Sequence, residues 1–488
     1  MRFVTNKNLK GVRLIESPIK FGTDGWRGVI AQDFTFDNVR ACAQGVADYL
    51  KQTGLAHQGL IVGYDNRFAS EDFASAAAEV IAGNEIKVYL CPKATPTPVI
   101  SFGVVAQKVG GAIIITASHN AAIWNGVKYK SEFGTSAPSE VTAKIEGNIT
   151  HTLATGKISQ MPLAKALEQG MVEYLDLTPG YSHQLAKLID LNELRQAKLK
   201  VVVDPMYGAG IGYFKMLLGD GAIELIEINN ERNPLFPGIQ PEPIAANLAK
   251  LSATVKKQEA NVGLATDGDA DRIGIVDENG VFLTSLQVFA LLALYLMEIR
   301  SERGLIVKTI TTTSMLYRLG EIFKVPVRET LVGFKYVAPI MIAENALIGG
   351  EESGGYGFRG HMPERDGILA GLYFLDLMLK TGKNPSELID YLYNKVGPHY
   401  FKRVDIEFPE EERQVIINRI KHNLPKSIDG IKVVNLDTKD GFRFTLADST
   451  WLLIRFSGTE PVLRIYTESN TPARVERLLE LGKELAGV

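Results

Sequence analysis

The strongest constraint on the fold is an alternation of short apolar runs and helix-period stretches, which repeats three times along the chain. The apolar runs have the length of strands, and the stretches between them place apolar residues three or four positions apart. Strands that alternate with helices predict a parallel sheet with helices on its faces. We therefore predict three α/β units of similar element order. Their third strands are expected at residues 112–115, 262–265 and 346–348.

The chain changes character from about Val396 onward. Short runs such as 441–445 and 451–455 are typical of short strands with alternating faces. Residues 472–485 predict a closing helix. This final part is expected to form a small α+β domain.

Composition excludes several classes of function. The 488 residues are too many for one hydrophobic core, so several domains are expected. The net charge of -3 gives no basic surface for nucleic acid or for an anionic membrane. Cys42 and Cys91 are the only cysteines, too few for a disulfide framework or a metal cluster, and both are expected to be small core residues.

The sequence also predicts a cytoplasmic protein without a membrane span. No uninterrupted apolar run reaches the roughly 18 residues that a spanning helix needs. Residues 1–20 carry five basic side chains but neither an apolar segment nor a cleavage site, so they make a poor secretory signal. We expect a short N-terminal extension instead.

Loops of small, acidic or nucleophilic residues follow the third strand of each unit. They lie at residues 116–120, 267–272 and 349–355. Open α/β sheets bind their ligands beyond the carboxyl ends of such strands. If the three units pack around a common cleft, these loops converge, and we expect them to work together.

The second of these loops has the composition of a metal site. Asp267, Asp269 and Asp271 alternate along it, so an extended backbone points their carboxylates to one side. Three such carboxylates repel one another unless a cation neutralises them, and oxygen ligands suit Mg²⁺. A calcium loop of the EF-hand type is disfavoured because Arg272 stands where that loop needs glycine. A solvated acidic turn remains the plain alternative.

Ser118, in the first loop, is the candidate nucleophile. Taken alone, Ser118 and Asn120 are typical of a simple turn. Beside a divalent cation, however, a serine suggests phosphoryl transfer through a covalent phosphoserine. His119 does not indicate a hydrolase triad, because sequence neighbours project apart and no nucleophile elbow is present. Lys128 is a better candidate for the acid/base group, since a desolvated amine can take part in proton transfer. The alternative is that Lys128 is an ordinary surface lysine after a turn.

Further candidates surround these two loops. Arg27 follows a glycine-rich phrase that begins at Phe21, and it offers a fixed cation. Glu351 and Ser353 suit sugar hydroxyls, and Lys335 is a candidate phosphate contact. In the C-terminal part, two arginines flank a turn of small residues, which predicts an anion-binding cradle. The alternative is a hairpin turn whose small residues are needed only for the turn geometry. That cradle consists of Arg455, Ser457, Gly458, Thr459 and Arg464.

Together these residues resemble the α-D-phosphohexomutase family, the phosphoglucomutase and phosphomannomutase enzymes. The resemblance covers about Phe21 to Tyr466, and four motifs occur in the family order. We name them the phosphoserine loop (116–120), the metal loop (267–272), the sugar loop (349–355) and the phosphate loop (455–461). The resemblance implies three related α/β domains with mixed, largely parallel sheets and a C-terminal α+β domain around a central cleft. The expected domains are residues 1–165, 166–282, 283–397 and 398–488.

The resemblance also implies a mechanism. Ser118, as phosphoserine, would give its phosphoryl group to a hexose phosphate and regain one from the bisphosphate that results. Mg²⁺ would be held by the phosphoserine and the three aspartates. Glucose 1,6-bisphosphate would be intermediate or activator, and small sugar phosphates would be the partners of a monomer or homodimer. Arg27, Lys128 and Arg272 would line the reacting end, and Glu351 and Ser353 would hold sugar hydroxyls. His119 and Lys335 would also bind the substrate, Lys335 as a phosphate contact, and the cradle would hold the other phosphate.

At two positions the sequence departs from the family pattern, which limits how far the roles of the family residues apply to this chain. Ala121 stands where the family often has proline, and Gly355 stands where many bacterial members have histidine. The acid/base role could therefore fall to Lys128 or to His361 downstream. Glucose is the expected sugar and mannose a second. A glucose-1,6-bisphosphate synthase with the same chemistry remains an alternative, as do a Ser118-dependent phosphatase and a non-catalytic sugar-phosphate-binding protein.

Overall fold

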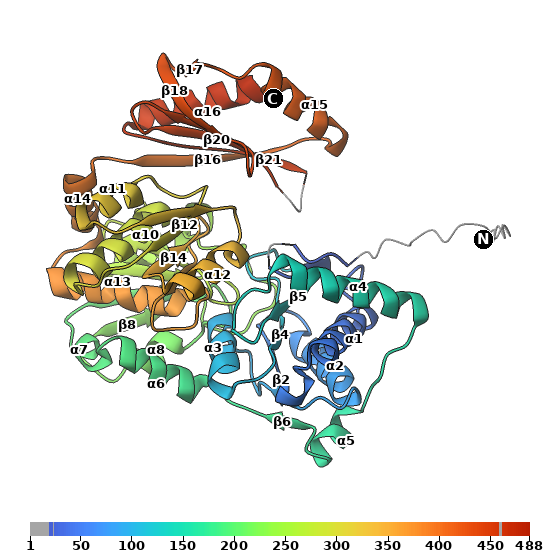
Figure 1. Ribbon diagram of the computed structural model, residues 1–488. Coiled ribbons are helices and arrows are strands. Elements are labelled where there is room, and N and C mark those ends of the chain that lie inside the picture. Colours follow the sequence, from blue (N-terminus) through green and yellow to red (C-terminus); the bar gives the residue numbers. More distant parts are fainter. Residues whose placement is uncertain (1–18, 23, 458–460) are drawn as a thin grey trace.

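The computed structural model describes residues 19–22, 24–457 and 461–488. Its three α/β domains follow one another along the chain, and a C-terminal domain lies beside the third (Figure 1). The first three sheets combine parallel and antiparallel pairs, whereas every pair in the fourth is antiparallel. The predicted fold class is confirmed.

The first domain has a six-stranded sheet in the order β1-β5-β4-β2-β3-β6. Strand β4 spans the predicted residues, Ala112–Ile115, and all four are buried because helices cover both faces. The sheet continues beyond residue 165, our expected boundary, because β6 (Val172–Tyr174) pairs with β3 in parallel. The other elements are β1 (Trp26–Val29), β2 (Leu60–Tyr64), β3 (Val88–Leu90), β5 (Trp124–Lys130), α1 (Phe36–Thr53), α2 (Ser70–Gly83), α3 (Thr97–Gln107), α4 (Ser139–Thr155) and α5 (Leu163–Glu168).

The second domain repeats the plan with five strands in the order β11-β10-β9-β7-β8. Its central strands, β7 and β9, are parallel and almost fully buried. The strands are β7 (Lys200–Asp204), β8 (Glu224–Glu227), β9 (Val262–Thr266), β10 (Ile273–Asp277) and β11 (Phe282–Leu283), and the helices are α6 (Thr178–Leu188), α7 (Leu191–Arg195), α8 (Tyr213–Leu218) and α9 (Ala249–Gln258).

The third domain has four strands in the order β13-β12-β14-β15. Helix α10 begins with a capping box, in which Thr284 and Gln287 satisfy each other's backbone amides. The elements are β12 (Ile306–Thr309), β13 (Val327–Thr330), β14 (Ile348–Gly350), β15 (Tyr356–Phe358), α10 (Ser285–Leu294), α11 (Met315–Phe323), α12 (Phe334–Glu344), α13 (Gly367–Thr381) and α14 (Pro385–Val396).

The C-terminal domain is an antiparallel sheet with two helices on one face. Its other face packs on the third domain, where Trp451, Leu453 and Tyr466 contact Ile310. The elements are β16 (Tyr400–Glu407), β17 (Ser427–Ile428), β18 (Ile431–Asp437), β19 (Phe442–Leu446), β20 (Trp451–Phe456), β21 (Val462–Ser469), α15 (Arg413–His422) and α16 (Pro472–Ala486).

One connection recurs in all three α/β domains. The phosphoserine, metal and sugar loops each join a central strand to an antiparallel return strand: β4 to β5, β9 to β10, and β14 to β15. A continuous hydrophobic cluster runs from α3 of the first domain through the second into α13 of the third. The loops therefore stand on domains that share a core. None of the helices in the described part of the chain combines the length and apolar character that a membrane crossing requires.

Candidate active site

Ser118 is held at the end of β4 in a strained, well-supported turn. Its φ of 53° lies in the left-handed region, which non-glycine residues adopt mainly where surrounding contacts enforce it. Its amide donates to Thr116 Oγ1 at 2.8 Å. The buried guanidinium of Arg67 donates to the carbonyls of Ser118 and Asn120, each at 2.6 Å, and to two further carbonyls of this turn. The serine is therefore positioned by a cation that we did not predict.

The phosphoserine loop meets the metal loop across the boundary between the first two domains. Ser118 Oγ donates to Asp267 Oδ2 at 2.8 Å. The approach is so close that a Cβ on Gly268 would lie 2.4 Å from the carbonyl oxygen of Ser118. Thr97, at the start of α3, donates its amide to the carbonyl of Asp269 at 2.9 Å and its hydroxyl to the carboxylate at 2.5 Å. The two predicted loops thus form one site.

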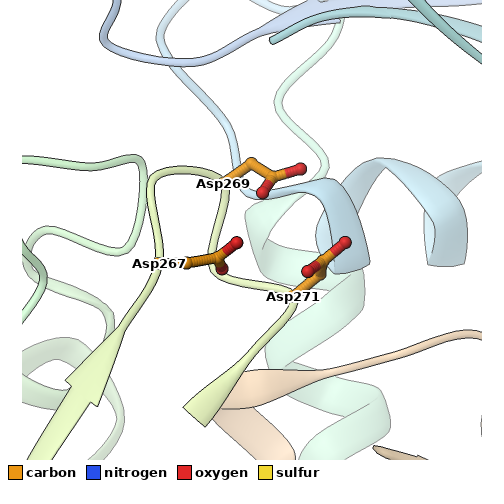
Figure 2. A group of neighbouring side chains, drawn as sticks. All are labelled: Asp267, Asp269 and Asp271. Carbon is orange, nitrogen blue, oxygen red and sulfur yellow. The ribbon is translucent and has the colours of Figure 1, made fainter. Parts of the chain in front are cut away.

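The three aspartates of the metal loop converge as predicted. Asp267, Asp269 and Asp271 are fully buried, and each offers a carboxylate oxygen within 4.8 Å of the others (Figure 2). Burial and the two neighbouring carboxylates raise the pKa of Asp267 well above its usual range. One oxygen each of Asp269 and Asp271 is buried with no hydrogen-bond partner among the described residues. Buried carboxylates that repel one another and keep unused oxygens fit a divalent cation such as Mg²⁺.

Lys128 lies beneath this cluster as a buried cation. Its ammonium is 2.7 Å from Asp269, 3.3 Å from Asp271 and 2.8 Å from Asp24. Burial lowers the pKa of Lys128, but the three carboxylates raise it by a larger amount, so the net shift is upward. Lys128 therefore carries a proton at neutral pH and neutralises the aspartates in this state.

Other predicted residues of the reacting end surround Ser118. Arg27 donates to the side chain of Asn120 at 2.5 Å. The backbone amide of Arg272 donates to Asp267 at 3.1 Å, and its guanidinium contacts Glu242 at 3.4 Å. His119 Nδ1 is 3.4 Å from Ser118 Oγ. Burial and the surrounding cations, Arg272 and Arg27 foremost, hold the pKa of His119 well below its usual range, so its ring is neutral.

Four charged residues of the site escaped the sequence analysis. Asp24 contacts Arg365 at 2.5 Å and Lys130 at 3.3 Å, and Arg365 reaches Asp271 at 3.0 Å. Glu364 contacts Lys130 at 2.8 Å. Burial raises the pKa of Asp24, but Lys128, Lys130 and Arg365 lower it well below its usual range. Only Asp24 carried a local signal, since it lies in the same glycine-rich phrase as Arg27.

The sugar loop presents polar groups beside this network. Glu351 Oε2 is 3.5 Å from Arg365, and burial raises the pKa of Glu351. Ser353 Oγ is buried and makes no hydrogen bond within the described residues. Lys335, at the start of α12, extends over the ring of Tyr336, with its ammonium 5.4 Å from the centroid.

His361 does not lie beside Ser118. Its Nε2 is 3.0 Å from Asp366 Oδ2, and its ring stacks on Phe102 with centroids 5.7 Å apart. Asp366 also caps α13, because it accepts the amide of Leu369 at 2.8 Å. The side chain of His361 is thus buried against Phe102 and Asp366, and its acid/base role stays a prediction.

The arginines of the phosphate loop occupy neighbouring strands. Arg455 on β20 and Arg464 on β21 are directly opposite each other in the sheet register. Like charges in this position repel, which favours an anion between them. Arg455 contacts Asp440 at 2.9 Å, and Arg464 contacts Asp405 at 3.5 Å. Ser457 is buried and donates its amide to Val462. The predictions for Gly458 and Thr459 lie outside the described residues.

Comparisons with known proteins match this arrangement over almost the whole chain. The family models named phosphoglucomutase/phosphomannomutase, α/β/α domains I, II and III and C-terminal domain, match residues 18–155, 179–280, 284–396 and 409–481. The chain belongs to this family. It is therefore an enzyme of the mutase type, an isomerase that transfers a phosphoryl group.

Individual relatives carry several substrate names. A phosphoglucomutase/phosphomannomutase of Thermococcus kodakarensis is 30% identical over 95% of this chain and 98% of its own. A probable phosphoglucosamine mutase of Methanothermobacter thermautotrophicus is also 30% identical, over 95% and 97%. The crystal structure of a putative phosphomannomutase from Thermus thermophilus is 34% identical, covers 97% of this chain and 100% of its own, and has a TM-score of 0.84. The family is thus clear, whereas the sugar differs among relatives.

Proposed function

We propose that this enzyme interconverts hexose 1-phosphate and hexose 6-phosphate through a phosphoserine at Ser118 and a hexose 1,6-bisphosphate. Glucose is the proposed sugar and mannose a second substrate. The observation that carries the proposal is the 2.8 Å contact between Ser118 Oγ and Asp267, one of three converging buried aspartates. A serine at a metal site, surrounded by cations, suits transfer of a charged phosphoryl group.

In each half-reaction, a sugar oxygen attacks the phosphorus carried by Ser118. The bond from Ser118 Oγ to phosphorus breaks, a bond from phosphorus to the sugar oxygen forms, and the proton lost by the sugar hydroxyl is balanced by the proton gained by Ser118 Oγ. The hydroxyl that donates to Asp267 corresponds to this dephosphorylated state. Arg27, Arg272 and neutral His119 line the transferring group, and Lys128 offsets the charge of the aspartates.

The metal loop supplies the proposed site for Mg²⁺, with Asp267, Asp269, Asp271 and the phosphoserine as ligands. A bound divalent cation would supply charge neutralisation for the phosphoryl group. Glucose 1,6-bisphosphate is the proposed intermediate, and when added it would phosphorylate Ser118 and so act as an activator.

The opposite end of the substrate is proposed to bind the C-terminal domain. Arg455 and Arg464, with Ser457, Gly458 and Thr459, would hold the phosphate that does not react. Glu351 and Ser353 would contact the sugar, and Lys335 would be a further phosphate contact. The hydroxyl of Ser353 is buried and makes no hydrogen bond to any described residue, which supports a polar ligand there.

The relatives named as phosphoglucosamine mutases add glucosamine phosphate to the candidate substrates. Two alternative functions use the same phosphoserine. A glucose-1,6-bisphosphate synthase would take the phosphoryl group from another sugar bisphosphate and would release the intermediate. A Ser118-dependent phosphatase would instead release free phosphate.

Product analysis with Mg²⁺ and traces of bisphosphate separates these functions. We expect glucose 1-phosphate to give glucose 6-phosphate, with mannose slower, and intact mass to show one phosphate on Ser118 that sugar phosphate removes. Ser118→Ala should lose at least a thousandfold in turnover, whereas Ser159→Ala, at an exposed position, should match the wild type. If no hexose 6-phosphate forms from any of the glucose, mannose or glucosamine 1-phosphates, the proposal is wrong.

A further inference from the structure

Two buried polar atoms of opposite kind face each other in the metal loop without forming a hydrogen bond. They are the donor Arg272 Nε and the acceptor Asp271 Oδ1, which lie 3.8 Å apart. Neither atom has a hydrogen-bond partner among the described residues. Arg272 Nε is also 3.9 Å from Asp267 Oδ2. These distances are too long for hydrogen bonds, so the guanidinium of Arg272 stops short of the aspartates although their charges attract it.

Glu242 holds the guanidinium from another direction. Its Oε1 accepts from Arg272 Nη1 at 3.4 Å, and both side chains are largely buried. The contact uses a different nitrogen from the one that faces Asp271. It therefore exists together with the weaker approach to the aspartates and sets how far the guanidinium can move toward them.

The backbone that carries Glu242 is fixed against the metal loop. Pro241 and Pro243 flank this residue, both are buried, and their rings restrict the backbone. The carbonyl of Pro241 accepts the amide of Gly268 at 3.2 Å. In β10, just after the metal loop, a Cβ on Gly274 would lie 2.7 Å from the carbonyl oxygen of Pro243. Glu242 is thus anchored to the same structure as the aspartates, and its carboxylate is a fixed point for Arg272.

We propose that Glu242 is a positioning residue that holds the guanidinium of Arg272 back from Asp271. Asp271 then stays open to a divalent cation, and Arg272 stays open to the phosphoryl group. An arginine that moved onto Asp271 would form a charge-assisted hydrogen bond and neutralise a metal ligand. The inference rests on the proposed function, in which the three aspartates bind Mg²⁺ and Arg272 lines the transferring group.

Two substitutions of Glu242 separate its hydrogen bond from its charge. Glu242→Ala removes the anchor, so Arg272 should pair with Asp271 and compete with Mg²⁺. We expect Mg²⁺ affinity to fall about tenfold, a loss common when a group that orients a metal site is removed. Glu242→Gln keeps an oxygen that can accept from Arg272 Nη1, so it should retain most of the affinity. A simple loss of negative charge near the cation would weaken both variants alike.

The test is calorimetric titration of the full-length variants with Mg²⁺, after intact mass has confirmed that Ser118 carries no phosphate. Glu242→Ala should cause no further loss of affinity in the Arg272→Ala background, whereas an effect that bypasses Arg272 would persist there. Glu231→Ala, which removes an exposed glutamate from the same connection between β8 and α9, is the matched control.

Turnover of glucose 1-phosphate gives a second readout. The kcat of Glu242→Ala should be low at limiting Mg²⁺ and should recover as Mg²⁺ is raised, because the cation displaces Arg272 from Asp271. A merely structural defect would lower kcat at every Mg²⁺ concentration.

Equal Mg²⁺ affinity in wild type and Glu242→Ala would overturn the inference. Equal losses in Glu242→Ala and Glu242→Gln, or a loss that persists in the Arg272→Ala background, would also overturn it. A wild type that binds Mg²⁺ but forms no hexose 6-phosphate would refute the proposed function instead, and the Mg²⁺ titrations would still decide the role of Glu242. A wild type that binds no Mg²⁺ would overturn both.

Discussion

At the scale of single residues, the site is held by buried charges that satisfy more than one partner. Arg67 donates to four carbonyls in and just after the phosphoserine loop and also contacts Asp65 at 3.2 Å. Thr116 connects the same carboxylate to the amide of Ser118. Ser118 is thereby fixed in a backbone conformation that a serine rarely adopts. A fixed position suits a group whose phosphorus must face the attacking sugar oxygen in the same geometry in every turnover.

Asp267 leads to a prediction about pH. Because burial and the neighbouring carboxylates raise its folded-state pKa, its favourable contribution to stability is present at low pH and is lost as pH rises through that pKa. Protons and Mg²⁺ compete for the same oxygens. The stabilisation by Mg²⁺ should therefore grow from mildly acidic to neutral pH, reaching about 2.7 kcal/mol of unfolding free energy at a hundredfold excess over Kd, and the melting temperature should rise with it.

Thermal unfolding with and without Mg²⁺ over a pH series measures this effect. Asp267→Asn should remove both the Mg²⁺ response and its pH dependence, and the metal-free variant should be more stable than the metal-free wild type at neutral pH. The exposed Asp220→Asn is the control. A Mg²⁺ response that is constant with pH would contradict the prediction.

The site residues that could be predicted from the sequence differ in their surroundings from those that could not. Ser118 and the three aspartates stand in short loops after apolar strands, so their place in the fold follows from local pattern. Arg67, Lys130 and Arg365 are buried because of partners far along the chain, such as Asp24 for Arg365. From the local sequence alone, a charged residue is predicted to be exposed. Its burial cannot be predicted because the residue of opposite charge is brought next to it only by the fold.

At the scale of elements, the recurring turn from a central strand into a return strand sets how closely the loops approach. Gly268 is a tight point of this contact, because a Cβ there would meet the carbonyl of Ser118. We expect Gly268→Ala to push the two loops apart and to lower kcat by roughly ten- to a hundredfold, as small misplacements of reacting groups do.

Steady-state kinetics with Gly147→Ala as control check this expectation. Gly147 lies in α4 with open space around it, so an added methyl should be tolerated or slightly stabilising, by about 0.5–1 kcal/mol. Wild-type kcat in Gly268→Ala would show that the approach of the loops is looser than the structure indicates.

Apolar elements were predictable because burial dictates their pattern, and β4 spans the expected residues. Strand β14 begins at Ile348 and continues through two glycines, which pair with β15 although glycine is a poor strand former. Strand β5 escaped prediction because Lys128 and Lys130 interrupt its apolar pattern, yet both are buried. Their burial depends on carboxylates far along the chain, such as Asp269 for Lys128 and Glu364 for Lys130.

At the scale of the whole molecule, an ionic cluster joins the C-terminal domain to the third domain. Glu329 on β13 contacts Lys308 at 2.6 Å and also Arg443 of β19. Burial lowers the pKa of Lys308 to about 8, whereas Lys308 and Arg443 outweigh burial and lower the pKa of Glu329. One carboxylate thus separates two cations from different domains.

Glu329→Gln should leave these cations facing each other and should weaken the attachment of the C-terminal domain by about 3 kcal/mol. Calorimetric unfolding should then show an earlier transition for that domain, and proteolysis near residue 398 should accelerate. Glu321→Gln, which removes an exposed pair with Arg318, serves as control. Indistinguishable unfolding of the two variants would show that this ionic cluster contributes little to the attachment.

The pairing of Asp24 with Arg365 has a consequence for how the protein is made. The two residues are 341 positions apart, so the buried network beneath the aspartates cannot close while the chain is still short. A ribosome adding roughly 5–20 residues per second would complete Arg365 about 20 to 70 s after Asp24. Until then Asp24 can pair with Lys128 and Lys130 of its own domain, but the network that includes Arg365 stays incomplete. The enzyme therefore completes its reactive geometry only late in translation.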